Sequence, residues 1–166
     1  MSKTTSNKGL TEHSRAVIEE WLKKYPADQK KSAVLAALRE VQHENKGYLT
    51  VALMDAVAGY LGMARIAVYE VASFYSMLET KPCGRHSISV CTNISCMLTG
   101  ADEIVSYIEK KLGIRTGEST RDGRFYLKRE EECLAACCGG PMMMVDHIYH
   151  EKLTPARVDA ILDKLE

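Results

Sequence analysis

The chain has 166 residues, 46% of them hydrophobic, and its 22 basic side chains are balanced by 22 acidic ones. A formal net charge of zero excludes binding to nucleic acid or to an anionic membrane surface through bulk positive charge. The N-terminal residues lack the apolar core of a signal peptide, and no run reaches the roughly 20 apolar residues of a membrane span. We therefore expect a soluble, intracellular protein of one domain or two small ones.

The first 80 residues contain no cysteine and show the apolar spacing of helices. Pro26 ends the first amphipathic stretch, Thr50 is a suitable N-cap, and Gly62 is suited to follow a helix end. Short loops between the segments predict a small helical bundle over residues 1–80. The expected helices cover residues 11–25, 30–49 and 51–61, and one or two short buried helices are expected within residues 64–78.

The remainder of the chain, residues 81–166, changes period. Alternating apolar and polar residues predict strands, and a helix with Asp102 in its first turn and Lys111 in its last has the charge order that suits the helix dipole. Thr154 and Pro155 predict the N-terminus of a last helix. This order predicts an α+β or α/β domain of three layers with a mixed sheet, of which the thioredoxin-like sandwich is the commonest small example. The expected elements are strands at 85–91, 123–130, 141–147 and 148–153, and helices at 99–113 and 155–166.

All six cysteines lie between positions 83 and 138. In a reducing compartment such clustering indicates metal ligands or redox groups more than structural disulfides. Four of the cysteines form two pairs, C-x4-C and C-x3-C, with 36 residues between the pairs. Each pair follows a predicted strand, so both can lie on loops at one edge of the sheet. The paired residues are Cys91, Cys96, Cys133 and Cys137.

Three kinds of site are compatible with these pairs, and the spacing favours the first. A [2Fe–2S] cluster takes two thiolates on each iron, which suits two widely separated pairs. Backbone N–H groups must also come close to the sulfurs, and the small side chains nearby allow this. Structural zinc usually uses C-x2-C knuckles, and thioredoxin-type catalysts use C-x2-C at a helix N-terminus. The small residues are Ala135, Ala136, Gly139 and Gly140.

Several other residues are considered and set aside. His86 and His147 are not spaced for a Rieske centre, which pairs two histidines with cysteines. Cys83 and Cys138 are left over, and both are expected to be non-ligands. Cys138 is adjacent to Cys137, and adjacent cysteines rarely ligate one small cluster together. Arg85 and Arg121 are expected by default to have a solvated surface role, and we also consider them as cationic neighbours of the site.

Longer segments of the chain resemble one family. They are VASFYSML, KPCGRHSISVCTNISC, LGIRTGESTRDGRFYL, ECLAACCGGPMMMVD and LTPARVDAILDKL. They resemble the small thioredoxin-like [2Fe–2S] subunit of the NADH-dehydrogenase module of bacterial respiratory complex I, a family with related subunits in NAD-linked hydrogenases and formate dehydrogenases. The likeness runs from about residue 15 to the end of the chain.

The resemblance implies a fold and a set of ligands. The fold is an N-terminal helical bundle followed by a thioredoxin-like [2Fe–2S] ferredoxin domain. The ligands of the single cluster, carried over motif by motif, are Cys91, Cys96, Cys133 and Cys137. The family usually has glycine where this chain has Ala135. The alanine should restrict the backbone conformations available at this position, but the site should still form.

The resemblance also implies partners. A larger flavoprotein subunit binds FMN and NADH, and we expect this chain to carry single electrons beside it as part of an NADH:quinone oxidoreductase. The sequence has neither a G-x-G-x-x-G fingerprint nor a P-loop, so the isolated chain is not expected to oxidise NADH. The chain should lie on the cytoplasmic side of the inner membrane through the other peripheral-arm subunits. The apolar run SFYSML at residues 73–78 could face a partner.

Other functions stay open from the sequence. The nearest alternative is the equivalent subunit of an NAD-linked hydrogenase or formate dehydrogenase. A stand-alone thioredoxin-like ferredoxin would not need the N-terminal helices. A zinc-stabilised interaction module without a redox role would be colourless, unlike a [2Fe–2S] protein.

Overall fold

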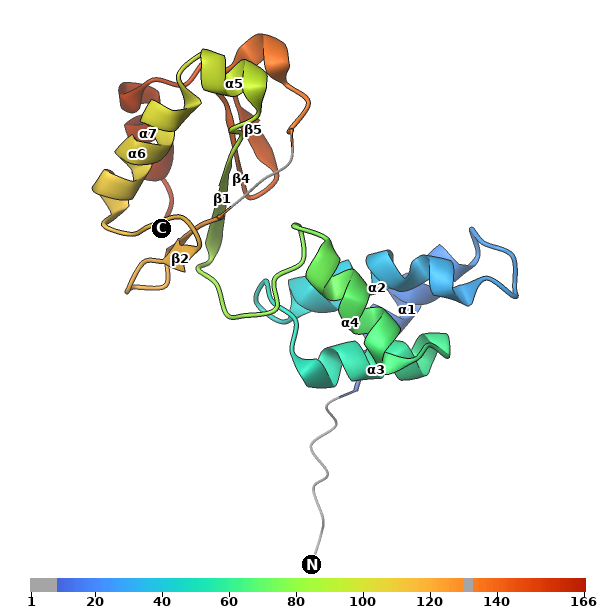
Figure 1. Ribbon diagram of the computed structural model, residues 1–166. Coiled ribbons are helices and arrows are strands. Elements are labelled where there is room, and N and C mark those ends of the chain that lie inside the picture. Colours follow the sequence, from blue (N-terminus) through green and yellow to red (C-terminus); the bar gives the residue numbers. More distant parts are fainter. Residues whose placement is uncertain (1–8, 130–132) are drawn as a thin grey trace, which may run out of the picture. The chain divides into compact units, whose positions relative to one another are not determined.

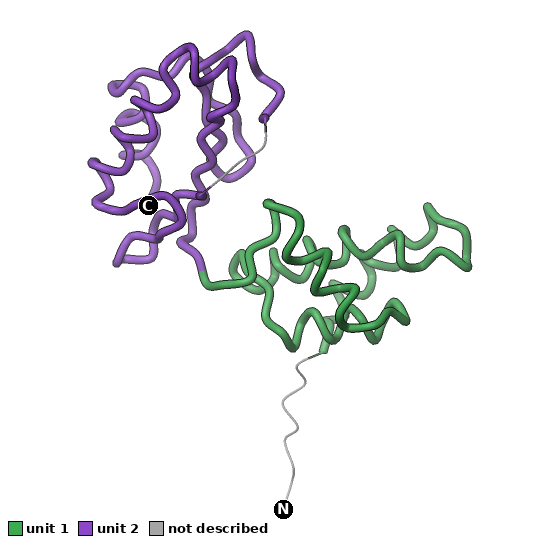
Figure 2. The backbone as a smooth tube through the Cα atoms, viewed as in Figure 1, with its two compact units in different colours: residues 1–82 green, residues 83–166 purple. Residues whose placement is uncertain are grey.

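The computed structural model describes residues 9–129 and 133–166, and it consists of two compact units, residues 1–82 and 83–166 (Figures 1 and 2). Each unit has its own hydrophobic core. Residues 1–8 fall outside the described residues, as does Glu130 at the end of one predicted strand. Within the described residues, no helix is long and apolar enough to cross a membrane.

The first unit is a bundle of four α-helices with one short 3-10 turn. The hydroxyl of Thr11 caps the first helix by accepting from the Ser14 amide, and that of Thr50 caps the third by accepting from Leu53. Gly62 ends the third helix in the left-handed conformation that glycine adopts without strain. The elements are α1 (Glu12–Leu22), η1 (Lys30–Ala33), α2 (Val34–Glu44), α3 (Val51–Leu61) and α4 (Arg65–Phe74).

The last helix of the bundle covers only part of the segment in which the sequence predicts helices. It ends at Phe74, because Tyr75 has the extended conformation with ψ of 121°. The side chain of Phe74 is 79% exposed and packs edge-on against Tyr75, with ring centroids 5.1 Å apart. The expected helical structure within residues 64–78 therefore ends at Phe74, and the aromatic run presents an exposed ring.

The second unit is built on a five-stranded sheet in the order β2-β3-β1-β4-β5. β1 pairs in parallel with β3, and the other three pairings are antiparallel, so the predicted mixed sheet is confirmed. The strands are β1 (His86–Val90), β2 (Glu118–Ser119), β3 (Phe125–Leu127), β4 (Met143–Val145) and β5 (Ile148–His150). The helices are α5 (Ile94–Leu98), α6 (Ala101–Leu112), the 3-10 turn η2 (Cys137–Gly139) and α7 (Pro155–Leu162).

Both long helices of this unit, α6 and α7, lie on one side of the sheet (Figure 1). Ile108 of α6 and Val158 of α7 belong to the same buried cluster as Ile88 and Val145, which are opposite each other on β1 and β4. The other face of β1 carries serines, and no long helix among the described residues covers it. Ser89 on this face is nevertheless buried, at 2% exposure. The expected α+β class with a mixed sheet is confirmed.

His86 joins three distant parts of the second unit at the start of β1. Its Nδ1 donates to Asp146 at 2.6 Å, and its Nε2 donates to the main-chain carbonyl of Glu166 at 2.9 Å. Both partners are acceptors, so the doubly protonated imidazolium is the form that satisfies them. The hydrogen bond that His86 donates to Asp146 raises the pKa of His86, against the opposing effect of burial, and the bond to the Glu166 carbonyl adds to the increase.

We predict that this contact makes the stability of the second unit depend on pH. Because the folded pKa of His86 lies above the ordinary value of about 6.5, its contribution is fully present below pH 6.5 and is lost as the pH rises through the folded pKa. His86→Gln should therefore lower the free energy of unfolding most in mildly acidic solution. Urea denaturation at pH values below and above 6.5, followed by circular dichroism, measures the difference in free energy of unfolding between His86→Gln and the unchanged chain.

His150→Gln provides a control of opposite sign. Burial lowers the pKa of His150, so its neutral form is favoured and its contribution to stability is lost as the pH falls below about 6.5. A difference curve for His86→Gln that is flat, or that runs parallel to the His150→Gln curve, would contradict the prediction.

Candidate metal centre

The four paired cysteines lie at one edge of the sheet. Cys91 directly follows β1, and Cys96 lies in α5, which the sequence did not predict. β3 is parallel to β1 and β4 is antiparallel to both, so the end of β1, the end of β3 and the start of β4 share this edge. Cys133 and Cys137 are in the segment that runs from β3 to β4.

The structure brings these four sulfurs together. The Sγ atoms of Cys133 and Cys137 are 3.7 Å apart. The thiol of Cys91 is within hydrogen-bonding reach of those of Cys96 and Cys133, and the charge of Cys137 acts on Cys96. None of the cysteines forms a disulfide. Two segments that are far apart in the sequence therefore present one group of thiols.

The two pairs differ in burial. Cys91 and Cys96 are 2% and 1% exposed, and they belong to a small apolar cluster with Leu134 and Met142. Cys133 and Cys137 are exposed. A metal group held by all four would thus have one side inside the protein and the other side at the surface.

Backbone amides point at three of the sulfurs. Cys91 accepts from two of them, Cys96 accepts from one, and Cys133 accepts from one. Such donors stabilise negative charge on sulfur without a charged side chain. The donating amides belong to Asn93, Leu134, Met142 and Ala135.

The amides and the burial set the acidity of the inner pair. Burial raises the pKa of Cys91, but the hydrogen bonds from Leu134, Asn93 and the neighbouring thiols outweigh it, so that the pKa is lowered overall. Burial, followed by the hydrogen bond and charge of Cys91, raises the pKa of Cys96 to about 11. Cys91 is consequently the thiol of this buried pair that ionises first, and a bound cation would be needed to ionise both.

The spacing of the sulfurs fits a group with two metals. Two thiolates on one tetrahedral metal, each about 2.3 Å from it, are about 3.8 Å apart, close to the 3.7 Å between Cys133 and Cys137. A single zinc ion would bring all four sulfurs to this separation. Among the residues the structure describes, no three cysteine sulfurs lie within 4.8 Å of one another. The arrangement of two pairs therefore suits two bridged irons better than one zinc ion.

The glycine at the start of the cis peptide Gly140–Pro141 keeps the second loop close to the first. A Cβ added to Gly140 would lie 2.6 Å from Oγ1 of Thr99 and 3.5 Å from Sγ of Cys96. A side chain at this position would have to displace the hydroxyl of Thr99, which follows α5, and would contact Cys96. The sequence interpretation that small residues let the backbone approach the sulfurs is thus supported here.

Three of the other residues considered from the sequence lie away from the four sulfurs, whereas Cys138 is next to Cys137. Cys83 is half-buried and precedes β1, at the end of the strand away from Cys91, and Cys138 is exposed in η2. The Arg85 amide donates to the Gly123 carbonyl just before β3, so Arg85 also lies at this far end. Arg121 precedes β3 and lies there too. The suggestion that these two arginines neighbour the site is wrong, because parallel strands place their starts at the opposite edge from their ends.

The fold and this sulfur geometry agree with the family comparison. Residues 18–166 match the thioredoxin-like [2Fe–2S] ferredoxin family. The chain belongs to that family, and its cofactor is accordingly one [2Fe–2S] cluster.

Three relatives resemble the chain over most of its length. The E-type subunit of NADH-quinone oxidoreductase from Rickettsia bellii is 40% identical over 165 residues, covering 99% of this chain and 98% of the relative. A subunit of the same type from Rhizobium meliloti is 42% identical over 149 residues, covering 90% of this chain and 86% of the relative. Mitochondrial NADH dehydrogenase [ubiquinone] flavoprotein 2 of Dictyostelium discoideum is 38% identical over 157 residues, covering 95% of this chain and 63% of that protein.

A solved structure shares the fold at lower identity. A chain of an NAD+-reducing [NiFe]-hydrogenase in the air-oxidised state superposes with a TM-score of 0.66 at 20% identity, over 79% of this chain and 22% of the hydrogenase chain. Likeness at this level concerns the fold alone. The relatives of higher identity, which are all subunits of NADH dehydrogenases, therefore outweigh it in judging function.

Ala135 occupies a backbone position that favours glycine. Its φ of +58° lies in the left-handed region, which costs an L-residue roughly 1–2 kcal/mol. The family's usual glycine at this position therefore has a conformational reason, and this chain keeps the same backbone with a strained alanine. The amide of Ala135 still donates to Cys133.

We predict that Ala135→Gly stabilises the second unit by about 0.5–1 kcal/mol, since relief of the strain exceeds the extra freedom of glycine in the unfolded chain. Chemical denaturation of the cluster-loaded protein measures the change. Ala136→Gly is the matched control, because Ala136 has an ordinary φ of −115° and its replacement should destabilise. Equal destabilisation by both substitutions would refute the assigned strain.

Proposed function

We propose that the chain is the one-electron carrier subunit of an NADH:quinone oxidoreductase, and that Cys91, Cys96, Cys133 and Cys137 hold its [2Fe–2S] cluster. The observation that carries the ligand assignment is the gathering of these four sulfurs at one sheet edge, with 3.7 Å between the outer two. The curated relatives of about 40% identity over nearly the whole chain support the enzyme.

The bound cluster supplies reversible one-electron chemistry. The protein's part is to hold a group whose charge, with two ferric ions, two sulfides and four thiolates, is about −2 and becomes about −3 on reduction. Cys91 and Cys96 keep water from one side of it, and the amides of Asn93, Leu134 and Met142 offset the added negative charge. The reduction potential then depends on these fixed dipoles and on the exposure of the outer pair.

The two units have different roles in this proposal. Residues 83–166 hold the cluster, and the helical residues 1–82 serve as a docking module that a free ferredoxin would not need. The exposed ring of Phe74 belongs to this module and is suited to a protein contact. Neither unit brings an NADH or flavin site that the sequence identifies, so FMN and NADH oxidation are assigned to a flavoprotein partner.

The partner is proposed to dock beside the cluster on α5. Ile94 and Leu98 on this helix are 71% and 77% exposed, while Cys96 between them is buried. An exposed apolar pair next to a redox group suits a partner that must come close and exclude water. The proposed location, on the cytoplasmic side of the inner membrane, follows from attachment to the rest of the peripheral arm.

The equivalent subunit of an NAD-linked hydrogenase or formate dehydrogenase is the second candidate. The fold shared with the hydrogenase is compatible with this role, whereas the identity of the curated relatives favours the respiratory enzyme. Identification of the subunits that purify with the chain separates the two.

We predict that Cys→Ser at any one of the four proposed ligands abolishes or strongly alters the visible spectrum and the EPR signal after dithionite. Serine cannot replace thiolate without changing the electronic structure of the iron. Cys138→Ser is the matched control, because Cys138 is adjacent to Cys137 and also exposed, and it should leave both spectra and the content of iron and acid-labile sulfide unchanged. Loss of the cluster in Cys138→Ser with an intact cluster in Cys137→Ser would reverse the assignment.

We predict that Leu98→Asp weakens binding of the flavoprotein subunit at least tenfold. The substitution removes an apolar contact worth roughly 1.5–3 kcal/mol and places a charge in the interface. Titration of the purified flavoprotein subunit, followed by interferometry, gives the dissociation constant, and the visible spectrum verifies that the cluster is intact. Ile148→Asp makes the same chemical change at a 63% exposed site on β5, and it should bind like the unchanged chain. Unaltered binding by Leu98→Asp would exclude α5 as the docking surface.

A further inference from the structure

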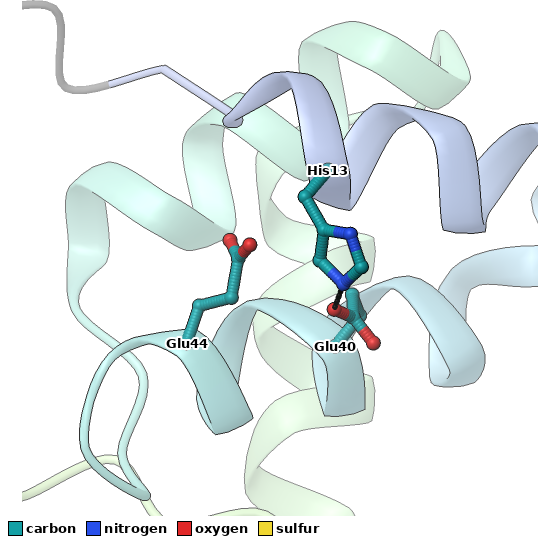
Figure 3. Close-up of side chains that lie close together, drawn as sticks. All are labelled: His13, Glu40 and Glu44. Carbon is teal, nitrogen blue, oxygen red and sulfur yellow. Dashed lines mark ion pairs between the residues drawn. The ribbon is translucent and has the colours of Figure 1, made fainter.

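A second group of metal-ligating side chains lies in the helical unit (Figure 3). It consists of His13 on α1 and of Glu40 and Glu44 on α2, and one ligand atom from each lies within 4.8 Å of the other two. Figure 3 shows the ring of His13 pointing from α1 toward α2 and the carboxylate of Glu44 pointing from α2 toward α1. The proposed function uses none of these residues.

The distance between His13 and Glu40 is that of two ligands of one ion. Nε2 of His13 lies 3.4 Å from Oε1 of Glu40. A charge-assisted hydrogen bond would be shorter, at about 2.7–2.9 Å. Two ligand atoms placed tetrahedrally at about 2.0–2.1 Å from zinc are about 3.4 Å apart. The pair is therefore loose as a direct ion pair and well spaced to share a metal.

Glu44 is held in place by other side chains. Both of its carboxylate oxygens accept from the hydroxyl of Thr11, at 2.9 and 3.0 Å, and one also accepts from the hydroxyl of Ser14. Ser14 is fully buried, so this anchor belongs to the packed contact between α1 and α2. A carboxylate with two oxygens keeps lone pairs for a metal after accepting these bonds. Hydrogen bonds of this kind orient metal-binding carboxylates.

The three positions also supply the access and spacing that a metal needs. Glu40 and Glu44 are four residues apart on α2 and so lie one above the other on one face of the helix. The side chain of His13 is 72% exposed, which leaves an open path from solvent and room for a water ligand. One imidazole nitrogen with two carboxylates suits a borderline ion such as zinc, whereas calcium and magnesium prefer oxygen ligands alone.

We propose that His13, Glu40 and Glu44 form a binding site for a divalent transition-metal ion of the zinc type. The ion bridges α1 and α2, and the fourth position is taken by water. It therefore ties the start of the chain's first helix to α2 and stabilises the helical unit. The proposal is independent of the iron–sulfur assignment, because it concerns different residues in a different unit.

The test is a calorimetric titration of Zn²⁺ into the cluster-loaded full chain. Cys83→Ser and Cys138→Ser are introduced into every chain used, so that the proposed non-ligand thiols do not bind the ion. We expect one saturable zinc site outside the cluster, and a rise in the thermal midpoint of the helical unit, reported by the fluorescence of Trp21 on α1. His13→Ala and Glu40→Gln should each weaken binding at least tenfold and remove the thermal shift.

Two matched controls keep the result specific. His43→Ala removes an exposed histidine of α2, and Glu12→Gln removes the carboxylate next to His13 in the chain, and neither residue belongs to the group of three. Both should bind zinc like the parent chain. Equal binding by all variants, loss of binding in His43→Ala alone, or no saturable binding up to about 1 mM would overturn the proposal.

Discussion

The arrangement of the sulfurs depends on the backbone of Met142 in the second segment, which is hydrogen-bonded to both cysteines of the first pair. Its carbonyl accepts from the Cys91 amide at 3.1 Å, and its own amide donates to the sulfur of Cys96. The first bond continues the antiparallel pairing of β1 and β4 by one step. Sheet formation therefore positions the second loop against the first before any metal contributes.

A consequence concerns the electrostatics of the site. A buried group that gains negative charge needs compensation, and arginine or lysine at this edge would provide it at long range and with flexible side chains. Lys128 and Arg129 follow the end of β3 at this edge, and the sulfurs themselves accept from peptide dipoles fixed by the loops after β1 and before β4. Fixed dipoles need little reorganisation when the charge changes, which suits rapid electron transfer.

The sequence predicts most elements but few of the contacts. The caps Thr50 and Thr154 and the charge order of α6 are local signals. The structure has the starts of α3 and α7 at their expected places and both ends of α6 within two residues of theirs. α5 has five residues and β2 has two, too few for a hydrophobic period to be visible. α4 ends early because the backbone of Tyr75 is extended, and no proline or glycine next to Tyr75 indicates this end in the sequence.

The site was predictable in its residues and not in its environment. The spacing of the cysteines and the family resemblance indicate four ligands, because thiolates and their loops follow a sequence pattern. The amide of Met142 and the opposite-edge position of Arg85 depend on strand direction, which no local pattern encodes. The left-handed backbone at Ala135 could be suspected only from the glycine usual in the family.

The unequal burial of the two cysteine pairs gives any group they hold a vulnerable side. Chelators and oxidants in solution can reach Cys133 and Cys137 directly, whereas Cys91 and Cys96 are shielded by Leu134 and Met142. Loss of a bound centre would therefore begin at the two exposed cysteines, because solvent reaches their sulfurs first. A partner that covers the outer pair then acts as a shield for the cofactor, so that assembly with its neighbours sets the lifetime of the centre as well as its use.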